Sequence, residues 1–277
     1  MNPAHEKRVS RTSVPEAAEQ PPEPAEFAGR VALVTGAGQG IGAATARILA
    51  ARGARVAVNY HKSEDRAREV VDAIRRRGGE AVAVQGDVTD PGQVTALVAA
   101  ARAELGPIDV LVLNAAGLGA HEARIAPATN LAWEDLEHVV TQQLKALFLT
   151  THAVLPDMVA RGGGSVVAVG AALARRPAPR FLPVTVAKAG VEAAVRTLAL
   201  EVGPHGVRVN AVEPNLILTE LARFIPEEQR RAAAERAALR RNGTPEDVAE
   251  VIAFLASQRA SYLTGSCLVA DGGTALA

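Results

Sequence analysis

The chain has 277 residues, of which 48% are hydrophobic and 22% are charged, and its 30 basic residues balance its 30 acidic residues. This composition suits a globular protein with a large core, and the balanced charge argues against a nucleic-acid or membrane partner. The single cysteine excludes a disulfide framework and leads us to expect no metal site. The chain also has no apolar run of about 18 residues that could span a bilayer. We therefore expect a cytoplasmic protein.

The first 28 residues differ in composition from the rest of the chain. They contain five prolines among glutamate, alanine, arginine and serine, and their apolar residues follow no period. Such a segment cannot bury enough apolar surface to offset the entropy lost on ordering. We therefore predict a disordered tail over residues 1–28 and a single folded domain over residues 29–277.

Predicted strands and helices alternate through this domain. Short β-branched runs predict strands at residues 31–34, 55–59, 81–85, 110–113, 165–169, 208–212 and 267–269. Longer alanine-rich stretches predict helices at residues 41–52, 65–77, 91–105, 133–161 and 187–203. This alternation is typical of right-handed βαβ units. The sequence therefore predicts an α/β fold: a Rossmann-type, doubly wound sheet of seven parallel strands, the last of them buried, with helices on both faces.

A glycine-rich turn follows the first predicted strand and leads directly into a helix. Its residues are Thr35, Gly36, Ala37, Gly38, Gln39, Gly40, Ile41 and Gly42, with the spacing T-G-x-x-x-G-x-G. Glycines allow a tight turn, and the N–H groups at a helix N-terminus bind the pyrophosphate of a dinucleotide. The alternative is that the glycines serve only close packing of strand and helix.

Further motifs occur at the ends of the later strands. They are Gly86-Asp87-Val88, Asn114-Ala115-Ala116-Gly117, Lys188, Pro214-Asn215-Leu216-Ile217-Leu218-Thr219 and Asp271-Gly272-Gly273. Together with the glycine-rich turn, they resemble the short-chain dehydrogenase/reductase family over about residues 29–277. Within that family the chain is most similar to the β-ketoacyl carrier-protein reductases.

The resemblance implies a set of cofactor-binding residues. It places Gly36, Gln39, Gly40, Ile41 and Gly42 at the phosphate turn, Asp87 and Val88 beside the adenine, Asn114, Ala115 and Ala116 along the cleft, and Pro214, Ile217 and Thr219 at the nicotinamide carboxamide. Two positions depart from the family pattern. Ala115 replaces the second asparagine of Asn-Asn-Ala-Gly, and Asn215 replaces a glycine, so that both affect how the nicotinamide is placed.

The end of the second predicted strand bears on the choice of cofactor. An acidic residue there would bind both ribose hydroxyls and repel a 2′-phosphate. The residues here are Asn59, Tyr60, His61 and Lys62. A neutral residue followed by basic groups favours NADP(H) over NAD(H). The alternative for Lys62 is a solvated basic turn.

The catalytic residues that the resemblance implies are largely replaced. The family uses a tyrosine that donates a proton, a lysine four residues later, a serine that binds the substrate oxygen, and an asparagine that orders a water. Lys188 is present, but Val184 stands at the tyrosine position and Ala171 at the serine position. The helical motif V-N-L-x-G-x-F aligns with residues 141–148 and puts Gln143 at the asparagine position. Phe181 also excludes the longer tyrosine spacing of the divergent enoyl reductases.

Three side chains are the remaining candidates for a proton source, besides Lys188 itself. Thr185 lies next to the lost tyrosine, Gln143 can act through a water, and His121 follows the fourth predicted strand. Each has a structural alternative: Thr185 as a helix cap, Gln143 in packing or backbone hydrogen bonds, and His121 as a solvated loop residue. We predict Lys188, Gln143 and Thr185 as catalytic residues.

The substrate and the partners follow from the resemblance less directly. Arg175, Arg176 and Arg180 lie near the expected substrate mouth, where they either bind an acidic substrate or carrier protein or form a solvated loop. Residues 221–241 occupy the place of the family's substrate lid, or form a static surface helix. We expect a small-molecule or carrier-bound substrate, and a homotetramer or homodimer built on the fourth and fifth helices.

Three functions from different classes stay open at this point. The first is an NADP(H)-dependent oxidoreductase with an atypical site, which acts on a carbonyl, a conjugated small molecule or an acyl chain with protonation assisted by the substrate. The second is a non-catalytic pseudoenzyme that binds cofactor or serves as an oligomer partner. The third is a non-redox isomerase, cyclase or dehydratase that uses the same cleft.

Overall fold

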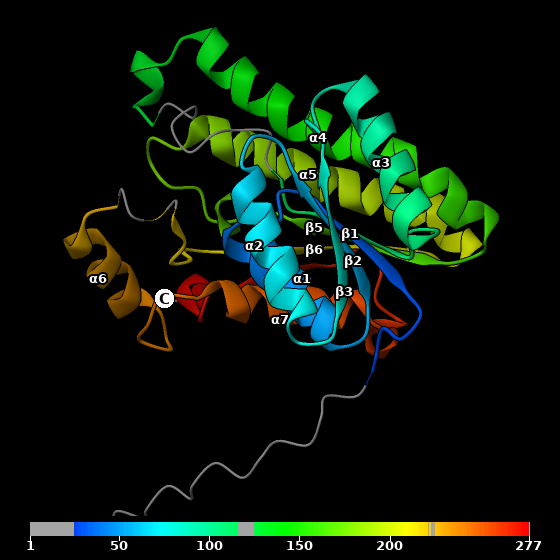
Figure 1. The fold of residues 1–277 in the computed structure, drawn as a ribbon. Helices are drawn as coiled ribbons and strands as arrows, with labels where there is room; N and C mark the ends of the chain where they lie inside the picture. Colours follow the sequence, from blue (N-terminus) through cyan, green and yellow to red (C-terminus); the bar gives the residue numbers. More distant parts are fainter. Residues whose placement is uncertain (1–24, 116–124, 221, 223–224, 277) are drawn as a thin grey trace, which may run out of the picture.

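The computed structural model describes residues 25–115, 125–220, 222 and 225–276 (Figure 1). Seven parallel strands form one sheet in the order β3-β2-β1-β4-β5-β6-β7. They are β1 (Val31–Val34), β2 (Arg55–Tyr60), β3 (Glu80–Gln85), β4 (Val110–Leu113), β5 (Gly164–Val169), β6 (Val207–Pro214) and β7 (Cys267–Ala270). The predicted doubly wound Rossmann-type sheet is confirmed. Its strand order reverses between β1 and β4, where such sheets bind ligands.

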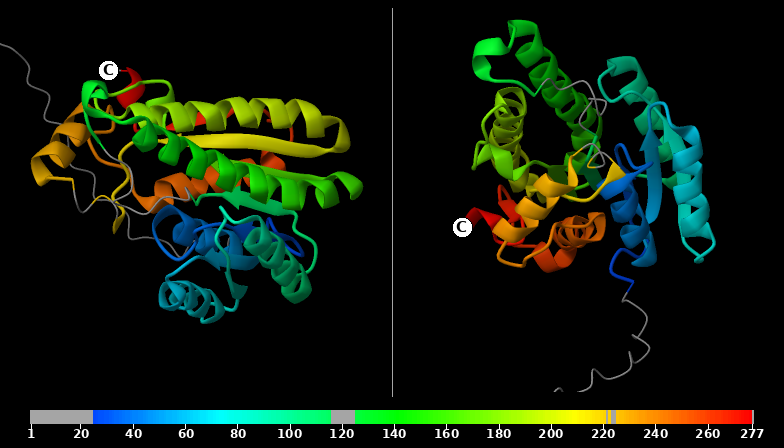
Figure 2. Two further views of the ribbon diagram at one scale, coloured as in Figure 1. Left: turned by 90° about the horizontal axis from the view of Figure 1, so that it is seen from above. Right: turned by 90° about the vertical axis from the view of Figure 1, so that its left-hand side faces the viewer.

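Helices cover both faces of the sheet, as the right-hand view of Figure 2 shows. They are α1 (Gly40–Ala51), α2 (Glu64–Arg75), α3 (Pro91–Leu105), α4 (Trp133–Ala160), α5 (Leu182–Val202), α6 (Glu227–Arg236) and α7 (Pro245–Ala256). One hydrophobic core joins the sheet to α1, α2 and α7, and the other joins it to α3, α4 and α5. Helix α6 lies apart from both layers (Figure 1). Among the described residues, none of the helices has the length and apolarity needed to cross a lipid bilayer.

The central strands are buried on both faces. All four residues of β1 and all four of β4 are buried, because side chains that alternate along each strand enter the two cores in turn. In β1, Leu33 contacts the core on the α3–α5 side and Val34 the core on the α1–α7 side. The carboxyl ends of these strands therefore have a fixed position, and the loops that follow them start from a rigid edge.

Three features differ from the sequence-based prediction. Helix α5 begins at Leu182 instead of residue 187, because Pro183 fits the first turn of a helix, where its missing N–H costs nothing. Strand β7 is an edge strand with half-buried residues, so the prediction that it is buried was wrong. Helix α7 was not among the predicted helices and begins with a capping box of Thr244 and Asp247. The predicted disordered tail lies outside the described residues, apart from its last four.

Candidate functional site

The glycine-rich turn connects β1 to the N-terminus of α1. Gly36 and Gly40 have φ angles of 61° and 55°, in the left-handed region that favours glycine. A Cβ atom on Gly42 would lie 2.6 Å from both Asn114 Nδ2 and Gly36 O, which leaves no space for a side chain. Gln39, at the N-cap of α1, makes no side-chain capping bond. The first N–H groups of the helix are thus left for an anion, and the turn fits the pyrophosphate of a dinucleotide.

Asn114 and Thr35 hold this turn against the end of β4. The Asn114 amide donates hydrogen bonds to Thr35 O (3.0 Å) and Gly36 O (3.1 Å). The Thr35 hydroxyl accepts from the N–H groups of Asn114 and Ala115, both at 3.0 Å, and donates to Val112 O. The side chain of Asn114 therefore fixes the backbone of the phosphate turn. Ala116 and His121 lie outside the described residues.

Asn59 also supports the turn, from the end of β2. Only 2% of the residue is exposed, and its Oδ1 accepts from the Gly36 N–H at 3.1 Å. Its amide donates to Gly86 O (3.0 Å) and Val84 O (3.3 Å). Because the side chain points inward, our prediction that Asn59 faces the adenosine ribose is corrected: it positions the turn instead.

The residues after Asn59 are therefore the ones nearer the surface at this end of β2. Tyr60 is half-buried, and burial together with the neighbouring Glu64 carboxylate raises the pKa of its phenol. His61 is exposed, and its Nε2 lies 3.7 Å from Asp87 Oδ2. Lys62 is exposed as well. The structure thus leaves His61 and Lys62 as the exposed basic groups directly after β2.

Asp87 and Val88 follow β3 and point in different directions. Asp87 Oδ1 accepts from the Thr89 N–H (2.9 Å) and hydroxyl (2.7 Å). Burial raises the pKa of Asp87, but the hydrogen bonds from Thr89 outweigh it, so that the pKa lies below its usual value. Val88 is buried in the core on the α3–α5 side, so only its backbone can border an adenine.

The loop after β6 folds over the glycine-rich turn. A Cβ atom on Gly40 would lie 3.3 Å from Thr219 Cγ2, so Thr219 is in close contact with the turn. Ile217 forms a bridge with Gly243 and is buried. Pro214 ends β6 and is buried as well. The structure therefore brings the predicted nicotinamide loop and the predicted phosphate turn together, although they are almost 180 residues apart in the sequence.

Lys188 is the one predicted catalytic group with a charged side chain. Its Nζ donates a hydrogen bond to Val169 O at 3.0 Å, at the carboxyl end of β5. Burial lowers the pKa of its ammonium group to about 8. Val184 lies one helical turn earlier, and Ala171 follows β5. Neither side chain can donate or accept a hydrogen bond.

Gln143 lies next to the Lys188 hydrogen-bond acceptor. It is 5% exposed and lines an internal cavity of about 10 Å³ together with Thr35, Ala115 and Val169. A cavity of this size holds about one water molecule. Gln143 and Val169 thus border the same small, mainly apolar cavity, which Lys188 does not line.

Thr185, predicted as a catalytic residue, is not the helix cap that was its structural alternative. It lies inside α5, whose N-cap is Phe181, and that helix has no side-chain capping bond. The Thr185 hydroxyl oxygen is buried and, within the described part of the chain, has no hydrogen-bond partner. The hydroxyl therefore makes no hydrogen bond within the described structure, but its oxygen is shielded from solvent.

A buried ionic network near the catalytic segment was not predicted. Glu213 is fully buried, and its Oε2 accepts from Arg175 Nε at 2.7 Å. Glu192 pairs with Arg196 at 2.5 Å and lies 3.6 Å from the Arg175 guanidinium. Burial, then the charge of Glu192, raises the pKa of Glu213. Arg175 is therefore paired with buried carboxylates, although 44% of its side chain is exposed.

This network also brings together atoms that could bind a metal ion. Ligand atoms of Glu192, Glu213 and Cys267 lie within 4.8 Å of one another, which the single cysteine gave no reason to expect. Two arginines already neutralise the two carboxylates, so the cluster is balanced in charge without a metal. The signal that could have identified the network is the glutamate within the apolar run of β6.

The other two arginines at the predicted substrate mouth contact backbone groups. Arg176 donates to Thr274 O, and Arg180 donates to Ile125 O at 3.4 Å. Arg180 also has a φ angle of 77°, which is uncommon for a residue with a side chain. The three arginines therefore hold the segment between Ala171 and Val184 to the rest of the protein.

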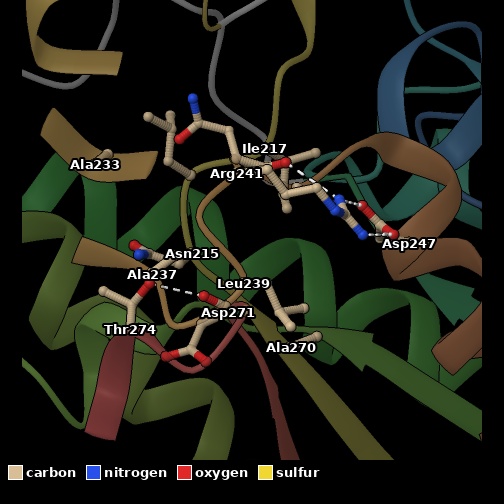
Figure 3. A pocket seen from close by; sticks show the side chains of 14 residues that line it. Asn215, Ile217, Ala233, Ala237, Leu239, Arg241, Asp247, Ala270, Asp271 and Thr274 are labelled. Carbon is tan, nitrogen blue, oxygen red and sulfur yellow. Dashed lines mark hydrogen bonds and ion pairs between the residues drawn. The ribbon is translucent and has the colours of Figure 1, made fainter. Parts of the chain in front are cut away.

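A cavity of about 140 Å³ lies beyond the carboxyl ends of β6 and β7 (Figure 3). Asn215, Ile217, Asp271 and Thr274 are among the residues that line it. At its rim, Arg241 forms two hydrogen bonds with Asp247, of 2.5 and 2.7 Å. Neither Lys188 nor Gln143 borders this cavity, so it is separate from the catalytic segment and shares only the loop after β6 with the cofactor site.

Comparisons with known proteins agree with this geometry. A family model described as enoyl-(acyl carrier protein) reductase matches residues 36–275. The human protein named dehydrogenase/reductase SDR family member 4 is 39% identical over 253 residues, 90% of this chain and 88% of its own length. Cis-4-hydroxycyclohexanecarboxylate dehydrogenase of Sinomonas cyclohexanicum is 41% identical over 89% of this chain and 97% of its own. A 3-oxoacyl-(acyl-carrier-protein) reductase of Staphylococcus epidermidis is 33% identical, with coverages of 87% and 97%.

Proposed function

The chain belongs to the short-chain dehydrogenase/reductase family, and on that premise we propose that it is an NADP(H)-dependent oxidoreductase with an atypical active site. The observation that supports this proposal is the contrast within the site. The turn for the dinucleotide is complete, and Lys188 is held at the end of β5, whereas the two side chains that would handle the proton are alanine and valine. Cofactor binding needs the first set, whereas binding and protonation of the substrate oxygen need the second.

The residues of the chain define how such a reaction would proceed. Gly36, Gly40 and Gly42 would bind the pyrophosphate, and Thr219 would contact the nicotinamide end. The nicotinamide, when bound, supplies or accepts the hydride. With a pKa of about 8, the Lys188 ammonium is charged at neutral pH and can donate to the ribose hydroxyls.

The proton itself must then come from the substrate or through Lys188. Ala171 and Val184 have no transferable proton, and the Thr185 hydroxyl is enclosed. A substrate with its own acidic hydroxyl, or a conjugated system that stabilises the negative charge, needs little help from a general acid. We therefore propose a carbonyl, conjugated small molecule or carrier-bound acyl chain as the substrate class. The names of the relatives, which include a cyclic hydroxy-acid dehydrogenase and a 3-oxoacyl reductase, support a carbonyl–alcohol pair.

The basic groups after β2 support NADP(H) over NAD(H). His61 and Lys62 are exposed there, and neither Asn59 nor Tyr60 provides the carboxylate that would repel a 2′-phosphate. Assembly into a homodimer or homotetramer is supported by the outer sides of α4 and α5. Phe148 on α4 is 61% exposed and Leu200 on α5 is 80% exposed, and a second copy of the chain would cover them.

A second candidate function is a pseudoenzyme that binds the cofactor without catalysis. The simultaneous loss of the tyrosine and serine positions favours it, because losing general acid catalysis costs about 10²–10⁴ in rate. In this case the complete phosphate turn would serve ligand sensing or assembly. The two candidates share cofactor binding and differ only in turnover.

One experiment separates them. Purified protein is titrated calorimetrically with NADPH and NADH, and reduction of an activated ketone is measured for the wild type, for Ala171→Ser and for Ala171→Ser/Val184→Tyr. We expect micromolar binding of NADPH, slow reduction by the wild type, and a gain of about 100-fold or more for the double variant. The single variant is the matched control and should gain far less. A folded double variant that binds NADPH but shows no gain would contradict a disarmed reductase.

A further inference from the structure

Arg66 connects three segments that meet at the rim of the phosphate turn. It lies in the first turn of α2, next to α1 in Figure 1. Its Nη1 donates to the side-chain oxygen of Gln39, inside the turn, and forms an ion pair with Glu220, directly after the loop that covers the turn. A Cβ atom on Gly38 would lie only 3.6 Å from Arg66 Cβ, so this part of α2 is in contact with the turn.

The charges at this rim are arranged unusually for an anion site. The N-terminus of α1 favours a negative ligand, yet the Glu220 carboxylate approaches the same place. Arg66 neutralises this carboxylate, and both side chains are partly exposed, at 47% and 43%. An exposed pair of this kind contributes little to stability, so it can be exchanged at low cost. A phosphate binds a guanidinium through two parallel hydrogen bonds and carries more charge than one carboxylate.

We propose that Arg66 is a phosphate-binding residue of the cofactor site, and that Glu220 occupies its guanidinium until a phosphate group of the dinucleotide replaces it. This inference rests on the proposed dinucleotide binding. Glu220 thereby acts as an internal competitor that lowers cofactor affinity. The phosphate is either the 2′-phosphate, since Arg66 follows His61 and Lys62 closely in the sequence, or the pyrophosphate, since Gln39 belongs to the turn.

The control for Arg66 is provided by the same helix. Arg68 is also exposed, at 69%, and pairs with Glu64 one turn away, but it has no contact with the glycine-rich turn among its described hydrogen bonds and ion pairs. Arg66→Ala and Arg68→Ala therefore remove the same charge from neighbouring positions. A weaker dinucleotide affinity in Arg66→Ala than in Arg68→Ala therefore results from the position of Arg66 beside the glycine-rich turn, and not from the loss of one positive charge.

The test is calorimetric binding of NADPH, NADH, adenosine 2′,5′-bisphosphate and AMP to the wild type and the variants. We expect Arg66→Ala to weaken NADPH binding by about tenfold to 100-fold, as for other hydrogen bonds to charged groups, and Arg68→Ala to change it less than about twofold. A loss for NADPH and the bisphosphate alone identifies the 2′-phosphate as the partner. An equal loss for NADPH and NADH identifies the pyrophosphate.

Glu220→Gln tests the exchange itself. It should tighten NADPH binding by about threefold or more, because Arg66 is then free of its carboxylate, and this gain should vanish in Arg66→Ala/Glu220→Gln. Unchanged NADPH affinity in Arg66→Ala, beside a wild type that binds NADPH, would overturn the proposal. A wild type that binds no dinucleotide would instead overturn the proposed function, so the two failures are distinguishable.

Discussion

The segments that follow β1 and β5 start from the same edge of the sheet but differ in how their polar groups are used. After β1, the polar side chains that hold the turn are paired inside the protein, with Thr35, Asn59 and Asn114 bonded to backbone groups of the turn and its neighbours. After β5, the two positions that carry the serine and the tyrosine in the family are the apolar residues Ala171 and Val184. In the same region, Arg175 pairs with the fully buried Glu213.

This difference shows which half of such a site the fold itself depends on. The phosphate turn is built from backbone and buried amides, so a change there also disturbs the packing of β1, β2 and β4. The catalytic side chains of the family extend from the edge of the sheet into the cleft, and the alanine and valine that replace them have no polar group that needs a partner there. Chemistry can thus be lost from this scaffold more easily than cofactor binding.

The largest expected effect comes from breaking the network after β5. Arg175→Met should lower the free energy of unfolding by about 3 kcal/mol at pH 8, because the fully buried Glu213 loses its cationic partner. The pKa of Glu213 is already raised, and this variant raises it further, so the folded state holds a proton that the unfolded state releases. Stability therefore falls as pH rises above the ordinary glutamate value, and the deficit should be smaller at pH 5. Urea unfolding at both pH values measures it.

Arg68→Met is the control for this variant, because it removes an exposed arginine with a partner one helical turn away and should cost less than about 1 kcal/mol. The network after β5 makes no described contact with the phosphate turn after β1. We therefore expect Arg175→Met to keep the NADPH affinity of the wild type at temperatures where the variant is folded. A parallel loss of NADPH affinity would show that the two regions are coupled.

A smaller effect is expected from crowding the phosphate turn. Gly42→Ala places a Cβ atom 2.6 Å from Asn114 Nδ2 and Gly36 O, and relief of this overlap must shift the turn. Overpacking of this kind costs about 1–3 kcal/mol, which corresponds to a loss of about tenfold to 100-fold in NADPH affinity by calorimetry. Gly163→Ala is the control, since a Cβ atom there would meet nothing within 4 Å. Equal affinity of the two variants would mean that the turn does not bind the dinucleotide.

The smallest expected change in NADPH affinity concerns the pH dependence of Lys188. Its pKa of about 8 lies below the usual value, so between pH 8 and 10.5 the unfolded chain holds a proton that the folded protein has released. Stability should rise with pH over this range, while NADPH affinity should fall severalfold from pH 7 to 9 as the ammonium is lost. Lys188→Met should remove both trends. Binding and unfolding titrations that are the same for this variant and the wild type would exclude Lys188 from the site.

Much of the fold could be predicted because its signals are local. The runs of β1 and β4 are apolar on both faces and stop at Thr35 and Asn114, so their bounds follow from the sequence alone. The start of α5 could not be predicted in the same way, because the apolar period begins only after Pro183, whose place in the first turn adds a segment without a period.

The candidate site could be predicted where spacing fixes it and not where distant segments meet. The glycine spacing identified the turn, but the inward position of Asn59 depends on partners 23 and 27 residues away. The pairing of Arg175 with Glu213 joins positions 38 residues apart, so no local pattern indicates it. The Asn59 contacts require the strand order β3-β2-β1, and the Arg175 contact requires the pairing of β5 with β6. The sequence motifs implied this strand order only through the family.

The single cysteine of the chain allows this network to be followed by the reaction of its thiol with a chromogenic reagent. Cys267 lies beside Glu213 and Glu192, and Arg175 Nη2 donates to its carbonyl oxygen at 3.2 Å. Burial, then the nearby carboxylates, raises the pKa of its thiol to about 11, so the thiolate that reacts with a chromogenic reagent is scarce at neutral pH. Reaction of this one thiol would follow each opening of the segment after β5, and its rate would time that motion without an added probe.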